Sequence, residues 1–347
     1  MMTRAVRAAL LAWAIAAPVM AETVTHLTYA DLPGWAADDH AAALAVFRNT
    51  CGDLRDPDWS ALCALAADVT DPRAFFELFF QPVLIADGQP PLITGYFEPE
   101  LTGALTPDDR FRFPVYSLPP DMPQGQPWLT RQDIDTTQAA RLAGLEIAWV
   151  DDAVDLFFMQ VQGSGRIRLP DGRVIRVGYA GANGQPYTSV GQELVARGVY
   201  APHQVSAEVI RNWVRRNPDA GQALLWVNRS YVFFRTVSQV PADQGPLGAM
   251  NRSVTPMRTI AVDPAFVPLG APVWLEKGGV HPLARLMVAQ DTGSAIRGAQ
   301  RADVFYGTGS LAGRRAGLVR DDGRLVVLLP IQRAYALLPD TVSPATP

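Results

Sequence analysis

The sequence predicts a mostly β fold in which one unit is inserted into another. Of its 347 residues only 18% are charged, while 28 are Gly and 29 are Pro, a composition that favours a loop-rich β protein over a helical bundle. From residue 90 onward, apolar and β-branched residues alternate with turn residues, as in short strands. The length suffices for one large or two ordinary domains.

The first 21 residues predict an export signal. Arg4 and Arg7 precede an apolar segment that is too short to span a membrane, and small residues before Glu22 fit a cleavage site. A retained anchor helix is the alternative. Because no Cys follows the apolar segment, a lipid anchor is not expected, and no later segment is long and apolar enough to cross a bilayer.

Short helices are expected next, and they carry both cysteines. Leu44, Phe47 and Cys51 share one face of the first helix, and Cys63 lies on the second. In an oxidising compartment an isolated pair favours a disulfide, with two free buried thiols as the alternative. Two Cys and four scattered His provide no metal cluster and argue against Ser-His-Asp or Cys-His enzymes. The net charge of -4 gives no reason to expect a nucleic-acid partner.

The later elements follow from caps, turns and periodicity. Helices are expected after the N-cap residue Asp71, and over residues 130–144, 188–198 and 206–218. Strands are expected over residues 90–101, 145–150, 155–181 and 226–237, and again from 246 onward, with a hairpin turn at Asp171–Gly172. The segment from about 104 to 241 is then one unit, inserted into another that is made from both ends of the chain.

Two carboxylates, Asp291 and Asp303, stand out in a segment rich in Gly, Ser and Thr. A carboxylic acid that stays protonated near neutral pH can protonate the leaving oxygen of a glycosidic bond. Burial or a second carboxylate raises the pKa in that direction. If the strands that carry them are neighbours, both acids face one cleft. The alternative is that they cap turns, which explains Asp263 equally well.

A second candidate site is the segment 157–169. On a strand, Gln160 and Gln162 point to the same face, and Ser164 is the next residue on that face. Two amides and a hydroxyl beside glycines suit the recognition of sugar hydroxyl and acetamido groups. A solvated strand face is the alternative.

Two further stretches carry weaker signals. Tyr96 and Phe97 are placed to stack on sugar rings, with Glu98 or Glu100 as acids, although an ordinary strand end explains them as well. The Gly-rich segment 178–192 lacks the Lys and the spacing of a phosphate-binding loop.

Taken in order, these blocks resemble the MltA family of lytic murein transglycosylases. The similar stretches are residues 94–101, 157–169, 178–192, 245–276 and 288–309. The last two are similar to the C-terminal three-aspartate (3D) region of that family, which maps onto Asp263, Asp291 and Asp303.

The resemblance implies a fold and a reaction. The fold would be a double-psi β-barrel made from residues 22–103 and 242–347, with residues 104–241 as a smaller inserted β domain and a groove between them. The reaction would be non-hydrolytic cleavage of the β-1,4 bond between N-acetylmuramic acid and N-acetylglucosamine, leaving a 1,6-anhydro end. Glycan strands of peptidoglycan would be the partner, the periplasm the location, and neither cofactor nor metal would be needed.

The resemblance also implies roles for individual residues. Asp303 would be the catalytic acid and Asp291 its neighbour, while the groove would be lined by Tyr96, Gln160, Gln162, Ser164 and Asp263. Two alternatives remain open: a hydrolytic muramidase with Asp291 as the base, and a non-catalytic protein that binds polysaccharide. Several members of the family are lipoproteins, and this chain departs from them because it has no lipid-accepting Cys.

Overall fold

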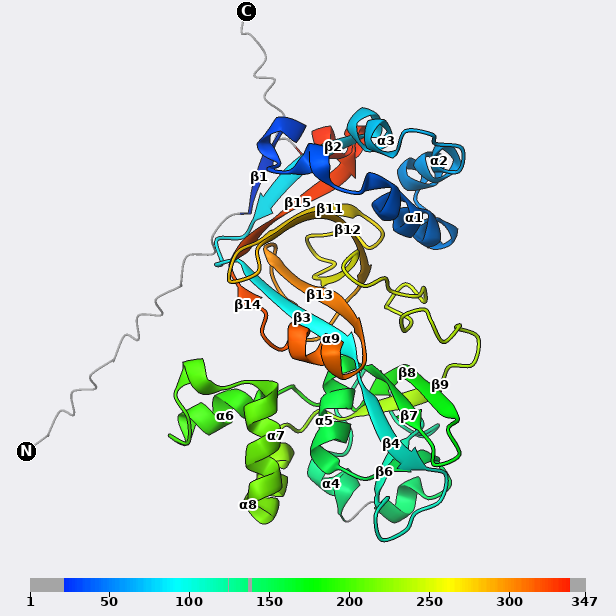
Figure 1. The fold of residues 1–347 in the computed structure, drawn as a ribbon, viewed down its shortest axis with the longest axis vertical. Coiled ribbons are helices and arrows are strands. Elements are labelled where there is room, and N and C mark those ends of the chain that lie inside the picture. Colours follow the sequence, from blue (N-terminus) through cyan, green and yellow to red (C-terminus); the bar gives the residue numbers. More distant parts are fainter. Residues whose placement is uncertain (1–21, 124, 137–138, 338–347) are drawn as a thin grey trace, which may run out of the picture.

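The computed structural model describes residues 22–123, 125–136 and 139–337, so the predicted signal at 1–21 lies outside the described residues. Two β-sheets dominate, and they occupy the upper and lower halves of Figure 1 with helices packed around each. The prediction of a mostly β fold with some helices is confirmed.

The upper sheet has nine described strands drawn from both ends of the chain. They are ordered β1-β2-β15-β11-β12-β10-β13-β3-β14, which is an open order among the described residues. Their bounds are β1 (Thr23–His26), β2 (Phe80–Ala86), β3 (Leu92–Glu98), β10 (Thr259–Val262), β11 (Pro272–Lys277), β12 (Leu283–Asp291), β13 (Arg301–Thr308), β14 (Arg320–Asp321) and β15 (Gly323–Pro330). The central strands β10, β11, β12 and β15 are mainly buried on both faces, and Trp274 lies fully buried among them.

The lower sheet has six described strands from the middle of the chain, ordered β5-β6-β4-β7-β8-β9. Their bounds are β4 (Glu100–Ala104), β5 (Phe113–Tyr116), β6 (Glu146–Val150), β7 (Ser164–Arg168), β8 (Val174–Ala182) and β9 (Val232–Thr236). The predicted hairpin turn is confirmed, because β7 and β8 pair antiparallel on either side of Gly172, whose φ is +86°. The domain boundaries at 104 and 241 stay predictions.

The three short helices predicted after the signal are present, as α1 (His40–Thr50), α2 (Pro57–Ala66) and α3 (Pro72–Phe79). They lie on one side of the upper sheet (Figure 1). Each begins with an aspartate whose side chain accepts a hydrogen bond from a backbone N–H of the first turn. A disulfide joins Cys51 and Cys63 and so ties the end of α1 to α2.

The predicted strand at 155–162 is wrong, because the chain forms helix α5 (Ala153–Gln162) there. Asp152 caps this helix by accepting hydrogen bonds from the N–H groups of Val154 and Asp155, and Gly163 ends it in the left-handed conformation at φ +76°. The apolar run Leu156–Met159 fits a buried strand or a buried helix equally well, so periodicity alone did not distinguish them.

The remaining helices are α4 (Arg131–Asp135), α6 (Val190–Ala196), α7 (Ala207–Arg216), α8 (Pro218–Val227), α9 (Gly309–Ala316) and α10 (Ile331–Ala336). The helix predicted over 130–144 ends at Asp135 and is followed by a 3-10 turn at Ala139–Leu142. The strand predicted from residue 226 begins only at Val232, because α8 extends to Val227. None of the helices in the described ranges has the length and hydrophobicity needed to cross a membrane.

A buried carboxylate joins the two sheets where β3 passes into β4. Glu98 is fully buried, and its two oxygens form ion pairs with Arg166 Nε at 2.8 Å and Arg176 Nε at 2.9 Å. The hydroxyl of Thr308, at the end of β13, donates to Glu98 Oε2 at 2.8 Å. Groups from both sheets therefore meet at one carboxylate.

Candidate active site

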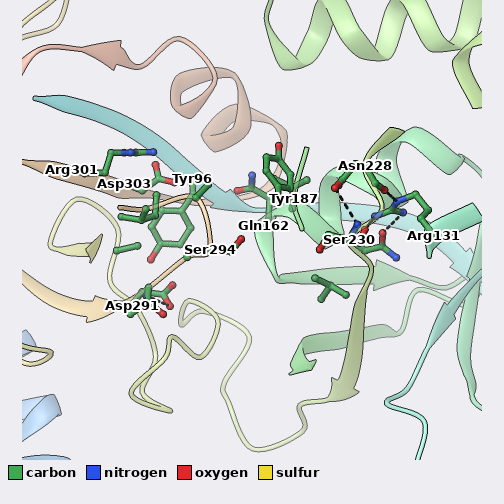
Figure 2. A pocket seen from close by; sticks show the side chains of 18 residues that line it. Tyr96, Arg131, Gln162, Tyr187, Asn228, Ser230, Asp291, Ser294, Arg301 and Asp303 are labelled. Atoms are coloured by element: carbon green, nitrogen blue, oxygen red, sulfur yellow. Dashed lines mark hydrogen bonds between the residues drawn. The ribbon is translucent and has the colours of Figure 1, made fainter. Parts of the chain in front are cut away.

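A cleft of about 170 Å³ lies between the two sheets (Figure 2). Its upper wall comes from β3, β10, the end of β12 with the loop that follows, and β13; the side chains include Tyr96, Ala261, Asp291, Ser294, Ile296, Arg301 and Asp303. Its lower wall comes from the segments around α4, α5, α8 and β9 and from the loop between β8 and α6; the side chains include Arg131, Gln160, Gln162, Tyr187, Asn228 and Ser230.

The two aspartates reach this cleft from strands that are not neighbours. The condition considered for the two acids, that their strands are neighbours, is not met, because β10 lies between β12 and β13. Ala261 of β10 is in register with Asp291 on one side and with Asp303 on the other, and Thr94 of β3 is in register with Asp303. Residues in register share a face, so the four form one row across four strands. Two strand spacings place the aspartate Cα atoms about 10 Å apart.

Asp303 occupies a site that keeps its carboxyl protonated to unusually high pH. Burial raises the pKa of Asp303 to about 6, and the negative charge of Asp291 adds a smaller increase. The hydroxyl of Thr94 donates to Asp303 Oδ1 at 2.8 Å, and this bond and the positive charge of Arg301 partly offset the effect of burial. A carboxyl with this pKa is part protonated near neutral pH, as a general acid requires.

Asp291 is held by the backbone rather than by a side chain. Its Oδ1 accepts hydrogen bonds from the N–H groups of Ala249 and Thr292, both at 2.9 Å. Burial nevertheless raises the pKa of Asp291 to about 6, and the two backbone bonds and the nearby Tyr96 hydroxyl act against that increase. The site therefore contains two carboxyls whose pKa values are raised mainly by the loss of solvation.

The apolar surroundings that desolvate both acids come from a small cluster on the same face. Tyr96 packs against Phe305 with a centroid distance of 5.2 Å, and the cluster includes Val254, Ala261 and Ile296. The Tyr96 hydroxyl points toward Asp291 in Figure 2, but among the described residues it forms no hydrogen bond of normal geometry. Tyr96, predicted to line the groove, thus lies in the wall beside both acids.

Gln160 and Gln162 both line the cleft, but not in the way that a strand would place them. Residues two apart on a helix point in different directions. Gln160 accepts a hydrogen bond from Arg131 Nη1 at 2.6 Å, whereas Gln162 accepts one from the backbone N–H of Phe97 at 2.9 Å. Gln162 therefore attaches α5 to the end of β3, next to Tyr96.

Two predicted groove residues do not line the cleft. Ser164 is buried in β7, with 6% of its surface exposed. Asp263 caps a turn, because its carboxylate accepts hydrogen bonds from the N–H groups of Ala265 at 3.2 Å and Gly298 at 2.9 Å. That is the turn-capping alternative considered for this residue.

Several cleft residues carried no clear signal in the sequence. Arg131 follows the cap residue Thr130 in a capping box and therefore resembled an ordinary first-turn residue. Its Nε and Nη2 donate to the backbone carbonyls of Asn228 and Ser230, almost a hundred residues later in the chain. Tyr187, Ser294 and Arg301 also line the cleft, and Thr94 bonds to Asp303 from beside it. All four lie in segments that the sequence analysis considered, residues 94–101, 178–192 and 288–309, but none of them was predicted as a site residue.

Comparison with known proteins agrees with this architecture. Residues 92–235 match the family model of the MltA specific insert domain, and residues 258–329 match that of the 3D domain. A Vibrio cholerae protein named membrane-bound lytic murein transglycosylase A is 32% identical over 288 residues, which are 78% of this chain and 76% of the relative. The chain belongs to the MltA family of lytic murein transglycosylases. The Escherichia coli MltA protein is 34% identical over 68% of this chain and 64% of its own length.

Solved structures of MltA proteins share the fold. A lytic murein transglycosylase from Agrobacterium tumefaciens matches with a TM-score of 0.81 and 33% identity, covering 90% of this chain and 99% of the other. Escherichia coli MltA with bound chitohexaose matches with a TM-score of 0.71 and 28% identity, covering 88% and 94%. The MltA fold thus extends over nearly the whole described part of the chain.

Proposed function

We propose that this MltA-family chain cleaves the β-1,4 bond between N-acetylmuramic acid and N-acetylglucosamine in peptidoglycan and leaves a 1,6-anhydro end. The observation that carries the proposal is the row of Asp303, Ala261 and Asp291 in the cleft wall, with Thr94 next to Asp303 in the same row and burial raising the pKa of both acids to about 6. The names of the relatives, which refer to murein, supply the substrate class.

In this mechanism Asp303 acts twice. Its protonated carboxyl first donates its proton to the glycosidic oxygen, and the C1–O bond breaks as the N-acetylglucosamine hydroxyl leaves. The carboxylate then takes the proton from the C6 hydroxyl of the same muramic acid, whose oxygen forms the new bond to C1. Asp303 ends protonated as it began, so one acid completes the cycle without water.

The neighbouring residues support this step. Thr94 holds Asp303 Oδ1 in place, which leaves the second oxygen available for the proton transfers. Asp291 disfavours the ionised form of Asp303 through its charge, and Tyr96, Gln160 and Gln162 lie where they would contact a glycan in the cleft. Roles for Ser164 and Asp263 in binding would have to be indirect.

We also propose a periplasmic location, because the substrate is peptidoglycan and relatives are named as membrane-bound. The double-psi barrel and the insertion at 104–241 likewise remain proposals. The resemblance supports the barrel, although the order of the described strands is open between β1 and β14.

Digestion of purified peptidoglycan by the chain from residue 22, followed by mass spectrometry, tests the proposed reaction. Muropeptides one water lighter than the hydrolytic products are expected, since the C6 hydroxyl replaces water as the nucleophile. Products at the hydrated mass would instead show a muramidase with Asp291 as base. Sedimentation with the wall without any product would show a binding protein.

A further inference from the structure

A second cavity, in the lower half of the molecule, is separate from the two aspartates. It measures about 520 Å³, against about 170 Å³ for the cleft, and falls within the usual range for small-molecule sites. Its walls come from β5, β6, α4, α5 and α8, and Arg131 is the one residue in the described part of the chain that lines both spaces.

Aromatic rings form much of this cavity. Trp149 of β6 and Trp226 of α8 are partly exposed, and the remaining rings are Phe113, Tyr116 and Tyr231. Flat aromatic faces at a protein surface pack well against the C–H faces of a pyranose ring, because both are apolar and planar in outline. Partly exposed tryptophans in a concave site favour a ligand that covers them.

The polar groups of the cavity are few and planar. Asp135 accepts a hydrogen bond from Trp226 Nε1 at 2.9 Å on Oδ2, and Gln222 lies beside the same oxygen at 3.5 Å. Asp135 Oδ1 has no hydrogen bond from a described residue. Carboxylate, amide and guanidinium groups are all suited to pairs of hydroxyls on neighbouring ring carbons.

The charges narrow the choice of ligand. Arg131 is buried and held by Gln160 and two carbonyls, with its guanidinium 5.0 Å from the Tyr231 ring, and Arg112 lies exposed at the rim. A free ammonium ion would be repelled by two guanidinium groups, and an apolar ligand would leave Asp135 unpaired. A neutral ligand rich in hydroxyl groups avoids both costs.

We propose that this cavity is a second carbohydrate site that binds one or two N-acetylated pyranose units and does not cut them. The choice of N-acetylated sugars rests on the proposed function, whereas the existence of the site rests on the cavity. The site would hold another stretch of glycan while the cleft acts, since Arg131 alone among the described residues is shared by the two spaces.

Calorimetric titration with chitotriose tests the site, using the chain from residue 22 with Asp303→Asn so that the probe is not consumed. Two binding events per chain are expected. Trp149→Ala should weaken one of them about tenfold or more through loss of stacking. Asp135→Asn, which keeps the side-chain shape, should weaken the same event through loss of an acceptor. Trp213→Ala, a partly buried tryptophan outside the cavity, serves as the control and should change neither.

A crystal structure with chitotriose should show a sugar ring against Trp149 or Trp226, with a hydroxyl on Asp135. A single event that neither cavity variant changes, or sugar in the cleft alone, would overturn the proposal. Binding of a free stem peptide in the cavity in place of chitotriose would overturn the choice of ligand. These experiments measure binding, whereas the proposed reaction is tested by the mass of its products. The second-site proposal and the proposed reaction can therefore fail independently of each other.

Discussion

At the scale of single residues, the proposed chemistry rests on the ionisation of two buried carboxyls, Asp291 and Asp303. Burial is the largest cause of the raised pKa at both Asp291 and Asp303, and the charge of Asp291 contributes less to Asp303 than burial does. The two acids differ in their partners instead. A side-chain hydroxyl holds Asp303, whereas two backbone N–H groups hold Asp291.

Replacing the proposed acid gives the first prediction. Asp303→Asn should lower the rate of peptidoglycan cleavage by at least about 10³-fold, because the amide matches the carboxyl in shape but cannot carry a proton. Asp291→Asn is the matched comparison, and its cleavage rate should fall by less, because burial still raises the pKa of Asp303. The measurement is the initial rate of muropeptide release, with circular dichroism to verify folding. If Asp303→Asn keeps its turnover, the assignment of the acid is wrong.

The same substitution predicts a change in how stability depends on pH. The pKa of Asp303 is 3.8 in the unfolded chain and about 6 in the fold. Its contribution to the free energy of unfolding is therefore complete below pH 3.8 and is lost as the pH rises through 6. Asp303→Asn removes that loss and should raise the free energy of unfolding by about 1–3 kcal/mol at pH 8. Each kcal/mol corresponds to a Tm increase of roughly 2–4 °C.

Thermal melts at pH 4 and pH 8 check this prediction. At pH 4 the wild-type carboxyl is protonated in the fold, so the variant and the wild type should melt within a degree or so of each other. An equal gain in Tm at both pH values would contradict a raised pKa and indicate a change in packing instead.

At the scale of elements, helix α5 positions the lower wall of the cleft against strand β3. Its cap, Asp152, also pairs with Arg215 of α7 at 2.8 Å, so the start of the helix is fixed by local and distant partners. Its last residue, Gln162, bonds to the backbone at Phe97 and brings the helix end beside Tyr96.

The disulfide between α1 and α2 gives a prediction at this scale. It closes a loop with a sequence separation of 12, for which chain entropy predicts about 3 kcal/mol of stability. The double variant Cys51→Ala/Cys63→Ala should therefore melt several degrees lower while cleaving peptidoglycan at the wild-type rate, since neither cysteine lines the cleft.

Melting with and without a reducing agent provides the control. The Tm of the wild type should fall when the disulfide is reduced, and the Tm of the double variant should stay the same. A response in the double variant, or none in the wild type, would show that the bond does not stabilise the fold.

At the scale of the whole molecule, the cleft exists because two sheets meet at a fixed junction. Glu98 is the centre of that junction, with arginines from the lower sheet on both oxygens and Thr308 from the upper sheet. Arg166 and Arg176 also donate to the carbonyl of Gln244, in the segment that returns the chain to the upper sheet. Both connections between the sheets are therefore held at one place.

Removing the charge of Glu98 should disturb this junction. Glu98→Gln leaves the buried guanidinium of Arg176 and the partly buried one of Arg166 without their counter-ion. It should reduce the free energy of unfolding by about 3–5 kcal/mol, as measured by urea titration. Glu100→Gln is the matched control, because its pair with Arg168 is largely exposed and should contribute less than about 1 kcal/mol. Equal losses in the two variants would contradict a special role for the buried carboxylate.

Much of the fold could be predicted because its signals are local. Asp71 before Pro72 predicted the start of α3, and Asp171–Gly172 predicted the hairpin between β7 and β8. The ordered blocks identified the family, which the comparisons confirm, and with it the segment that carries Asp291 and Asp303. Caps, turns and motifs depend on residues that are close together in the chain, so they can be predicted from the sequence alone.

Tertiary structure decided the features that depend on distant partners. The placement of β10 between the two acids follows from the pairing of strands that are tens of residues apart in the chain. The apolar run in α5 is compatible with a strand or a helix, and only its packing partners decide for the helix. Arg131 became a cleft residue only because Asn228 and Ser230 fold against it. The raised pKa of Asp303 has the same origin, because desolvation depends on what the whole molecule packs around a carboxyl, which no spacing along the chain determines.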